Sequence, residues 1–121
     1  MKKLTLAVAT LAGLAACASV PLDTSALDRA SSAVDRANDA GSVEYAPLEL
    51  RAAREKLAEA RIAAEERNGD LANRLAAESL VSAELALAKS DAARARERTR
   101  AQRESNQQLR QELQTDSGRE Q

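Results

Sequence analysis

Histidine, phenylalanine and tryptophan are absent from this sequence of 121 residues, and tyrosine, cysteine and methionine occur once each. The absence of histidine excludes a catalytic or metal site built on imidazole, and a single cysteine excludes a disulfide framework within the chain. The scarcity of aromatic and other β-forming residues argues against a β-sandwich, a Rossmann-type sheet and an aromatic cage. We therefore expect a protein that is not an enzyme and that has no metal, no cofactor and no small-molecule substrate.

Alanine and charged residues dominate the composition. Alanine fills 28 positions, and charged residues make up 31% of the chain with a formal net charge of −1. A chain rich in alanine, glutamate, arginine and leucine is typical of long helices and coiled coils. The composition therefore predicts an all-α fold.

The N-terminus has the features of an export signal. Met1-Lys2-Lys3 is basic, and a mainly apolar run follows over residues 4–16. This run is shorter than the roughly 20 residues that a membrane-spanning helix needs. A short basic leader followed by an apolar stretch of this size is typical of a secretory signal peptide.

The apolar run ends in Leu14-Ala15-Ala16-Cys17, which resembles the lipobox of bacterial lipoproteins. This match predicts that residues 1–16 are removed by cleavage between Ala16 and Cys17, and that the Cys17 thiol carries a diacylglycerol. The alternative is an ordinary signal cleavage site at which the thiol is incidental, because Ala16-Cys17-Ala18 also has small residues on both sides.

Lipid on Cys17 would anchor the chain to a membrane, and the chain would not span it. Two or more acyl chains are enough to hold a protein to a membrane stably. In bacterial lipoproteins an aspartate directly after the cysteine usually marks retention in the inner membrane, and here that residue is Ala18. We therefore expect a lipoprotein of the outer membrane of a Gram-negative-type bacterium, facing the periplasm, with the inner membrane less favoured. Residues 17–25 contain a proline and small or polar residues and are expected to form the tether. Export from the cytoplasm also argues against a nucleic-acid partner.

Apolar residues spaced three and four apart predict three helices, over residues 26–40, 47–68, and 70–92 and beyond. Residues 42–46 are expected to be a connector. The short link between the second and third helices predicts that they lie antiparallel and adjacent. The expected architecture is therefore an antiparallel helical hairpin with a shorter N-terminal helix.

Capping and helix-breaking residues mark the ends of these helices. Thr24 or Ser25 can cap the first helix, and Gly41 can end it in a left-handed conformation. Pro47 suits the first position of the second helix. In Asn68-Gly69-Asp70, we expect the glycine to end one helix and the aspartate to cap the next.

A length argument places the end of the packed domain near residue 92. The helix predicted from residue 47 is roughly 32 Å long, which is only about half the length of the final helix if that helix is continuous. The apolar stripe also fades near residue 91. We therefore expect an alanine-rich domain over residues 26–92 and a charged helical extension over residues 93–121, with the last residues, 115–121, disordered.

Two features are candidate interaction sites. Tyr45 is the only aromatic residue, and it is either a recognition anchor or a ring that packs over the helix start with its hydroxyl in water. The C-terminal extension opens with an arginine cluster that is either a solvated face or a contact surface for anionic lipid or an acidic partner. The cluster consists of Arg94, Arg96, Arg98, Arg100 and Arg103.

The block Glu44-Tyr45-Ala46-Pro47-Leu48-Glu49-Leu50 resembles a signature of the domain-of-unknown-function 4398 family of small bacterial envelope proteins. The resemblance extends over roughly residues 20 to 95 and includes the alanine-rich segments at 53–60, 72–76 and 83–86. It implies a helical, often lipid-anchored periplasmic module, which in some relatives precedes a peptidoglycan-binding domain. The family brings no catalytic residues.

The sequence leaves two functional classes open. The first is a structural or protein-interaction component of the cell envelope, which docks with another envelope protein or with itself through alanine and leucine helix faces. The second is a binding module for cell-wall polymer or anionic lipid that works through the arginine-rich extension. Binding through the extension should weaken steeply with salt, whereas docking through an apolar face should not.

Overall fold

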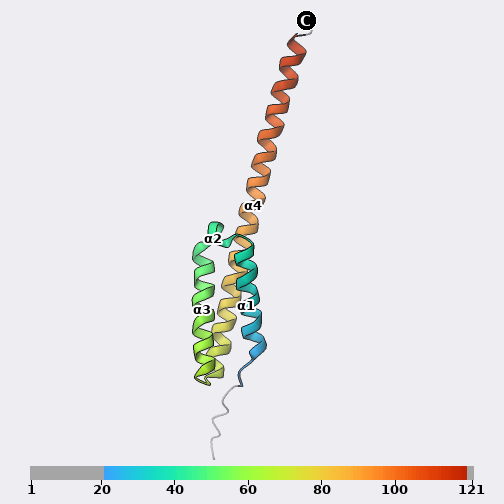
Figure 1. The fold of residues 1–121 in the computed structure, drawn as a ribbon. Coiled ribbons are helices and arrows are strands. Elements are labelled where there is room, and N and C mark those ends of the chain that lie inside the picture. The colour runs from blue at the N-terminus through green and yellow to red at the C-terminus, as the bar shows by residue number, and fades with distance from the viewer. Residues whose placement is uncertain (1–20, 120–121) are drawn as a thin grey trace, which may run out of the picture.

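The computed structural model describes residues 21–119, and within this range the protein is all-helical. The structure has four helices: α1 (Thr24–Asp39), α2 (Ser42–Tyr45), α3 (Pro47–Glu65) and α4 (Gly69–Arg119). Helices α1, α3 and α4 lie side by side as a bundle, and α4 continues far beyond the other two (Figure 1). The predicted signal peptide and Cys17 lie outside the described residues.

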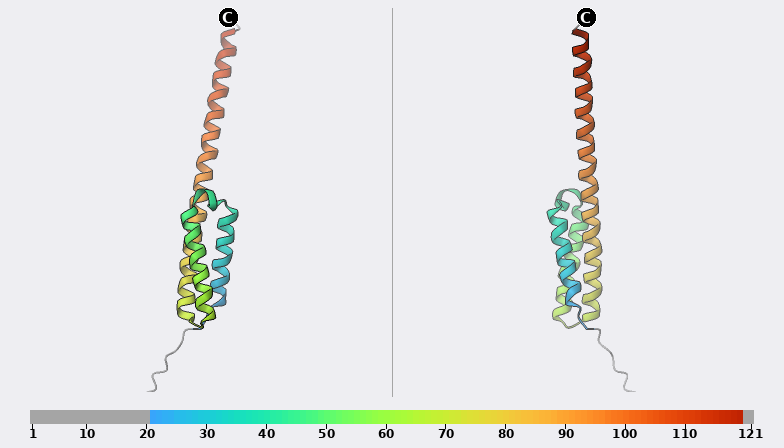
Figure 2. Two further views of the ribbon diagram at one scale, coloured as in Figure 1. Left: turned by 60° about the vertical axis from the view of Figure 1, so that its left-hand side comes forward. Right: turned by 90° about the vertical axis from the view of Figure 1, so that its right-hand side faces the viewer.

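The described part of the structure has four helices where three were expected. Residues Ser42–Tyr45, expected as a connector, form the short helix α2. Helix α1 contacts both α3 and α4, so the packed part is a three-helix bundle (Figure 2). The left-handed Gly41, with a φ of 77°, ends α1 as predicted. The amides that follow it donate hydrogen bonds to carbonyls three or four residues earlier, and these bonds form the turn of α2. Buried backbone groups need such partners.

The start of α1 also differs from the prediction. The helix begins at Thr24, and its N-cap is Asp23, whose side chain accepts a hydrogen bond from the Ser25 amide at 3.0 Å. Aspartate caps a helix as well as serine or threonine does. The start of α3 is as predicted, because Pro47 occupies its first turn.

The break between α3 and α4 is confirmed, but its chemistry differs from the prediction. Helix α3 ends at Glu65, and the left-handed residue is Arg67, with a φ of 60°, rather than Gly69. The Asn68 amide donates to the Ala63 carbonyl at 2.9 Å and the Arg67 amide to Ala64 at 3.0 Å, which is a Schellman ending.

The cap of α4 is Asn68 rather than Asp70, because the Asn68 side-chain carbonyl accepts a hydrogen bond from the Leu71 amide at 3.2 Å. Gly69 is the first residue of α4 and is buried. At Gly69, therefore, the missing side chain suits a buried position and does not serve a left-handed turn.

Alanine fills most of the bundle core. Among the described residues, 12 of the 16 buried hydrophobic residues are alanine, so the helix backbones can approach closely. Ser79 of α4 is also fully buried and donates to the Ala53 carbonyl of α3 at 2.8 Å. The four larger core residues are Val34, Leu50, Leu57 and Leu75.

A serine pair closes the end of the core where α2 meets α4. Ser42 and Ser90 are both fully buried, and their hydroxyl oxygens lie 2.7 Å apart. Because Ser90 donates to the Ala86 carbonyl at 2.8 Å, Ser42 is the donor within the pair. Both buried hydroxyls therefore have partners, as buried polar groups require.

Beyond the bundle, α4 continues as a single helix whose side chains are exposed as far as Asp116. Ser90 is the last buried residue, Ala93 and Arg94 are half-buried, and residues 95–116 are all exposed. We call residues 95–119 the projecting segment; it is roughly 36 Å long at 1.5 Å per residue. No helix within residues 21–119 is both long enough and apolar enough to cross a bilayer.

The disorder expected for residues 115–121 is wrong for residues 115–119, because α4 continues to Arg119. Residues 120–121 lie outside the described range. The sequence has neither glycine nor proline between Gly69 and Gly118, so no residue between them breaks the helix.

Candidate functional site

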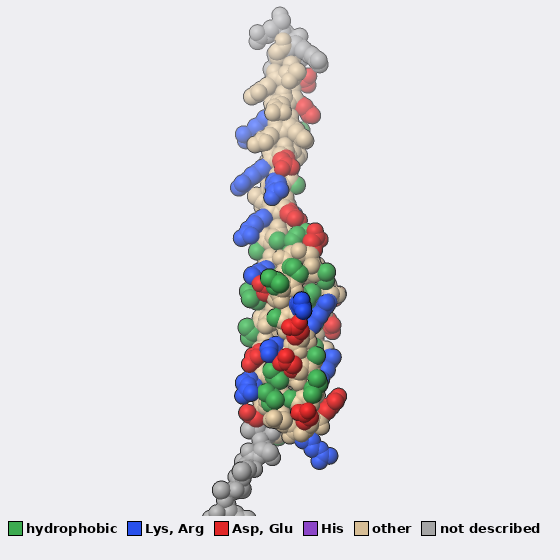
Figure 3. Space-filling view, turned by 90° about the vertical axis from the view of Figure 1, so that its left-hand side faces the viewer, with side chains coloured by type: hydrophobic (Ala, Val, Ile, Leu, Met, Phe, Trp, Pro, Cys, Tyr) green, Lys and Arg blue, Asp and Glu red, His purple; other side chains and the backbone are tan. Residues whose placement is uncertain are grey.

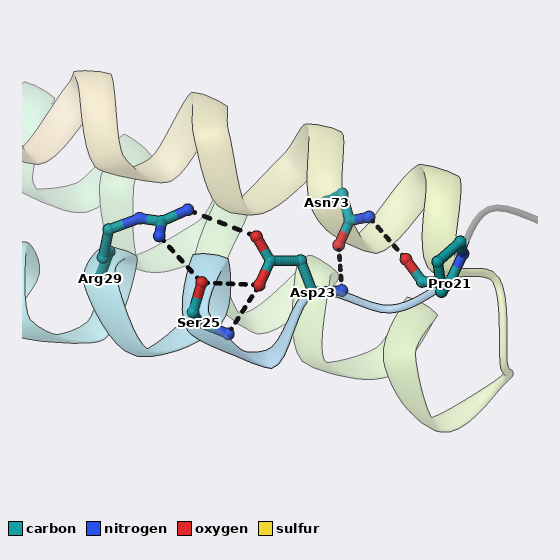
Figure 4. A network of polar contacts seen from close by, with 5 residues as sticks. All are labelled: Pro21, Asp23, Ser25, Arg29 and Asn73. Carbon is teal, nitrogen blue, oxygen red and sulfur yellow. Dashed lines mark hydrogen bonds and ion pairs between the residues drawn. The ribbon is translucent and has the colours of Figure 1, made fainter.

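Asn73 of α4 holds the first described residues of the chain against the bundle (Figure 4). Its side-chain carbonyl accepts the Asp23 amide at 2.9 Å, and its side-chain amide donates to the Pro21 carbonyl at 3.1 Å. One side chain therefore binds the backbone on both sides of Leu22. The contact fixes the point at which the chain enters the fold, beside the turn between α3 and α4.

The Asp23 carboxylate joins this contact to the start of α1. It accepts hydrogen bonds from the Ser25 amide at 3.0 Å and the Ser25 hydroxyl at 2.6 Å, and it lies 3.4 Å from the Arg29 guanidinium. The Ser25 hydroxyl bond is the main cause of a lowered Asp23 pKa, to which backbone amides and Arg29 also contribute. We call Pro21, Asp23, Ser25, Arg29 and Asn73 the N-terminal clamp.

Tyr45 lies at the opposite end of the bundle, where α2 meets α4. Its hydroxyl donates to a Glu97 carboxylate oxygen at 2.8 Å, and its half-buried ring packs beside Gly41. The hydrogen bond to Glu97 is the main cause of a raised Tyr45 pKa. The hydroxyl, which was expected to lie in water if the ring packs over the helix start, therefore also has a protein partner. A recognition role for Tyr45 stays a prediction.

Arg94 differs from the other members of the arginine cluster. It is half-buried, and its guanidinium donates to the Ala40 carbonyl at the C-terminal end of α1. It also lies 3.8 Å from the Asp91 carboxylate. A cation is favourable at the negative end of a helix dipole. Arg94 therefore joins α4 to α1 and is not part of a solvated face.

The other four arginines are exposed on the projecting segment. Arg96, Arg100 and Arg103 follow each other at spacings of four and three residues, so they share one face of α4. They flank a shallow open groove that Ala95 and Thr99 complete. Arg98 points to the other side of the helix. Figure 3 shows basic side chains mainly along one side of the projecting segment and acidic ones along the other.

Within residues 21–119 no cluster of three or more histidine, cysteine, aspartate or glutamate side chains could hold a metal ion. What the described surface offers is an exposed helix with basic and apolar side chains. Such a surface can bind a partner.

Sequence reasoning missed three residues that define the ends of the bundle, namely Asn73, Ser90 and Glu97. Asn73 carries the only available signal, because asparagine is unfavourable inside a helix unless its side chain has a specific partner. Ser90 and Glu97 contact residues 48 and 52 positions away, and nothing in the local pattern reveals those partners.

Comparison with known families and structures gives one match. A family model described as a domain of unknown function, DUF4398, matches residues 25–103. No curated protein and no solved structure matches the chain. The match covers α1, α2, α3 and the first part of α4, including all five arginines of the predicted cluster.

Proposed function

Since the chain belongs to the DUF4398 family, a domain to which no activity is assigned, we propose that it is a lipid-anchored helical module of the bacterial cell envelope. In this proposal the protein is not an enzyme. Lipid on Cys17 holds it to the outer membrane, the bundle stands on the periplasmic face, and the projecting segment contacts an envelope protein. It is thus a structural or interaction component of the envelope.

The observation that carries the proposal is that the two ends of the bundle differ. The N-terminal clamp lies at one end of the bundle, and the projecting segment leaves from the other end (Figure 1). The chain between Cys17 and Pro21 can extend by no more than about 14 Å, at about 3.6 Å per residue. A lipid on Cys17 would therefore keep the clamped end of the bundle near the membrane. The projecting segment would begin roughly 39 Å farther out along α4.

The exposure of the projecting segment supports a partner. Most helical stability in proteins comes from packing an apolar face against another element, and isolated helices are marginal in water. From Ala95 to Asp116 every residue is exposed, including the large apolar Leu109 and Leu113. A helix with so little burial is expected to gain order from contact with another molecule.

Membrane fractionation with intact-mass measurement tests the anchor. We expect the protein in the outer-membrane fraction, with a mass equal to residues 17–121 plus acyl chains. The variant Cys17→Ser should remain unprocessed or leave the membrane. A mature chain that starts at Ser19 and carries no acyl mass would overturn the proposal.

The second candidate function is binding of cell-wall polymer or anionic lipid through the face of α4 that carries Arg96, Arg100 and Arg103. Arg96, Arg100 and Arg103 form no ion pair within the described residues, so their charges are available to an anionic surface. Such binding should weaken steeply between low and physiological salt because exposed charges are screened. Cosedimentation of the protein with peptidoglycan or with phosphatidylglycerol vesicles over a salt series separates this function from apolar docking.

A further inference from the structure

Helix α4 carries a second heptad pattern on the face opposite its core-facing residues. The pattern starts within the bundle and continues along the projecting segment with alternating spacings of four and three residues and no interruption. All of its members are exposed. We call this set the outer stripe: Val81, Leu85, Ala88, Ala92, Ala95, Thr99, Gln102, Asn106, Leu109 and Leu113.

The outer stripe is apolar at both ends and small or polar in its middle. Val81, Leu85, Leu109 and Leu113 are 64%, 49%, 54% and 67% exposed, although each is a large hydrophobic residue. Ala88, Ala92 and Ala95 let a second helix approach closely. The core-facing residues of α4, such as Ala83 and Ser90, lie half a turn away, so the bundle does not use this face.

We propose that two copies of this chain pair through their outer stripes as a parallel coiled coil over residues 81–113. A parallel pair places both N-terminal clamps at the same end, so two chains held in one membrane can form it. The inference names a partner for the interaction module proposed above and rests on that function only for the shared orientation of the tethers.

The charges beside the outer stripe distinguish the two possible orientations. With Leu85, Thr99 and Asn106 at a positions, the four e positions between Leu85 and Leu113 are all basic. In an antiparallel pair e positions face e positions, so arginines would oppose arginines along the contact. The e positions are Lys89, Arg96, Arg103 and Arg110.

In a parallel pair each e position faces a g position of the other copy. Asp91, at a g position, then faces Arg96 of the second copy, and Glu84, also at a g position, faces Lys89 of the second copy. Each Lys89 also pairs with Glu49 of its own chain. One pair, Arg98 with Arg103, has like charges. The charge pattern therefore favours the parallel orientation, with two attractive pairs for each repulsive one.

Asn106 adds a second feature of parallel pairing. A single asparagine at an a position fixes the register and favours a dimer, because the two amides can bond only when they face each other. Asn106 has exposed apolar neighbours in the outer stripe, Leu109 and Leu113. In a parallel, in-register pair the two Asn106 side chains would meet at the same level.

The size of the contact predicts a weak dimer that depends on local concentration. Thirty-three residues of helix are roughly 50 Å long, and a helix is about 10 Å wide, so two copies would bury on the order of 1,000 Å². That area lies at the lower limit for specific interfaces. Confinement of both chains to one membrane raises their effective concentration and favours the pair.

Variants of the full chain that each gain one cysteine besides Cys17, produced in cells and oxidised in the membrane, test the proposal. Ala92→Cys and Thr99→Cys occupy a positions, whereas Ala101→Cys and Gln111→Cys occupy the opposite face. In a coiled coil the facing Cα atoms lie about 5 Å apart and those on the outer faces about 14 Å apart. A disulfide needs a Cα separation of about 4.4 to 6.8 Å.

We expect a disulfide-linked dimer from both a-position variants. The two control variants should give no more dimer than the parental chain, which has Cys17 alone. A dimer at no position, or equal yields at all four, would overturn the inference. A dimer at only one a position would indicate antiparallel pairing and would also contradict it. If no variant forms a dimer but the protein still crosslinks to another envelope protein, the dimer is contradicted and the proposed function is not.

Discussion

Two side chains, Asn73 and Tyr45, connect the ends of the bundle to α4. Asn73 binds the backbone of the incoming chain through both atoms of its amide, and Tyr45 reaches from α2 to Glu97. Each bond adds little net stability, because folding exchanges it for hydrogen bonds with water. Their importance lies in position, because they set where the tether joins the fold and where the packed part of α4 ends.

The Tyr45–Glu97 bond predicts a measurable titration. Because the protein has one tyrosine and no tryptophan, its phenolate absorbance reports Tyr45 alone. The bond to Glu97 raises the Tyr45 pKa above 10.0, so its contribution to stability is present below that pH and is lost as the pH rises through the raised value. We expect Glu97→Gln to lower the titration midpoint, with Glu104→Gln as the control. Equal midpoints in the wild type and Glu97→Gln would show that the bond is absent in solution.

At the scale of the helices, sequence periodicity predicted where helices form but not how each one begins and ends. The apolar spacing identified α1, α3 and α4 because burial of one helix face is a strong and repeated signal. Individual caps contribute only about 1 kcal/mol, and neighbouring residues can serve equally well. Asp23 and Asn68 therefore took the capping roles assigned to their neighbours, and the long-range contacts of Asn73 and Glu97 depend on the folded arrangement.

The left-handed Arg67 is a strained helix ending that substitution should relieve. A residue with a side chain costs about 1–2 kcal/mol in this conformation, whereas glycine adopts it freely. We expect Arg67→Gly to raise the thermal midpoint by a few degrees, after the greater chain entropy of glycine is subtracted. Arg74→Gly, within α4, should lower it by a similar amount. A lower midpoint for Arg67→Gly in a thermal melt would contradict the structure of this turn.

Close packing of α3 on α4 gives a further prediction. Ser79 is fully buried and its hydroxyl lies 2.8 Å from the Ala53 carbonyl, so there is little room for a larger side chain. Ser79→Leu should separate the two helices and cost about 1–3 kcal/mol in the free energy of unfolding. The control is Ser82→Leu, at a half-buried position on the same helix, which should cost clearly less. Equal losses in chemical denaturation would argue against a closely packed interface.

At the scale of the whole molecule, the bundle and the projecting segment have separate roles. The bundle is expected to be complete without the residues beyond Glu97, because Arg94 and Glu97 make the last described hydrogen bonds from α4 to the other helices. The projecting segment beyond them carries basic and apolar side chains to a distance from the predicted membrane anchor. The central claim is that folding uses the first part of α4 and leaves the rest free for contact.

The most direct test is the thermal midpoint of two truncated chains, measured at low protein concentration so that weak pairs are dissociated. A chain that ends at Arg98 keeps the contacts of Arg94 and Glu97 and should melt within about 4 °C of the full chain, since surface changes cost within about 0.5 kcal/mol. A chain that ends at Ala93 loses both contacts and should melt several degrees lower. A fall of more than about 8 °C on truncation at Arg98 would contradict the account, because a loss above 1 kcal/mol requires contacts between the residues after Arg98 and the bundle.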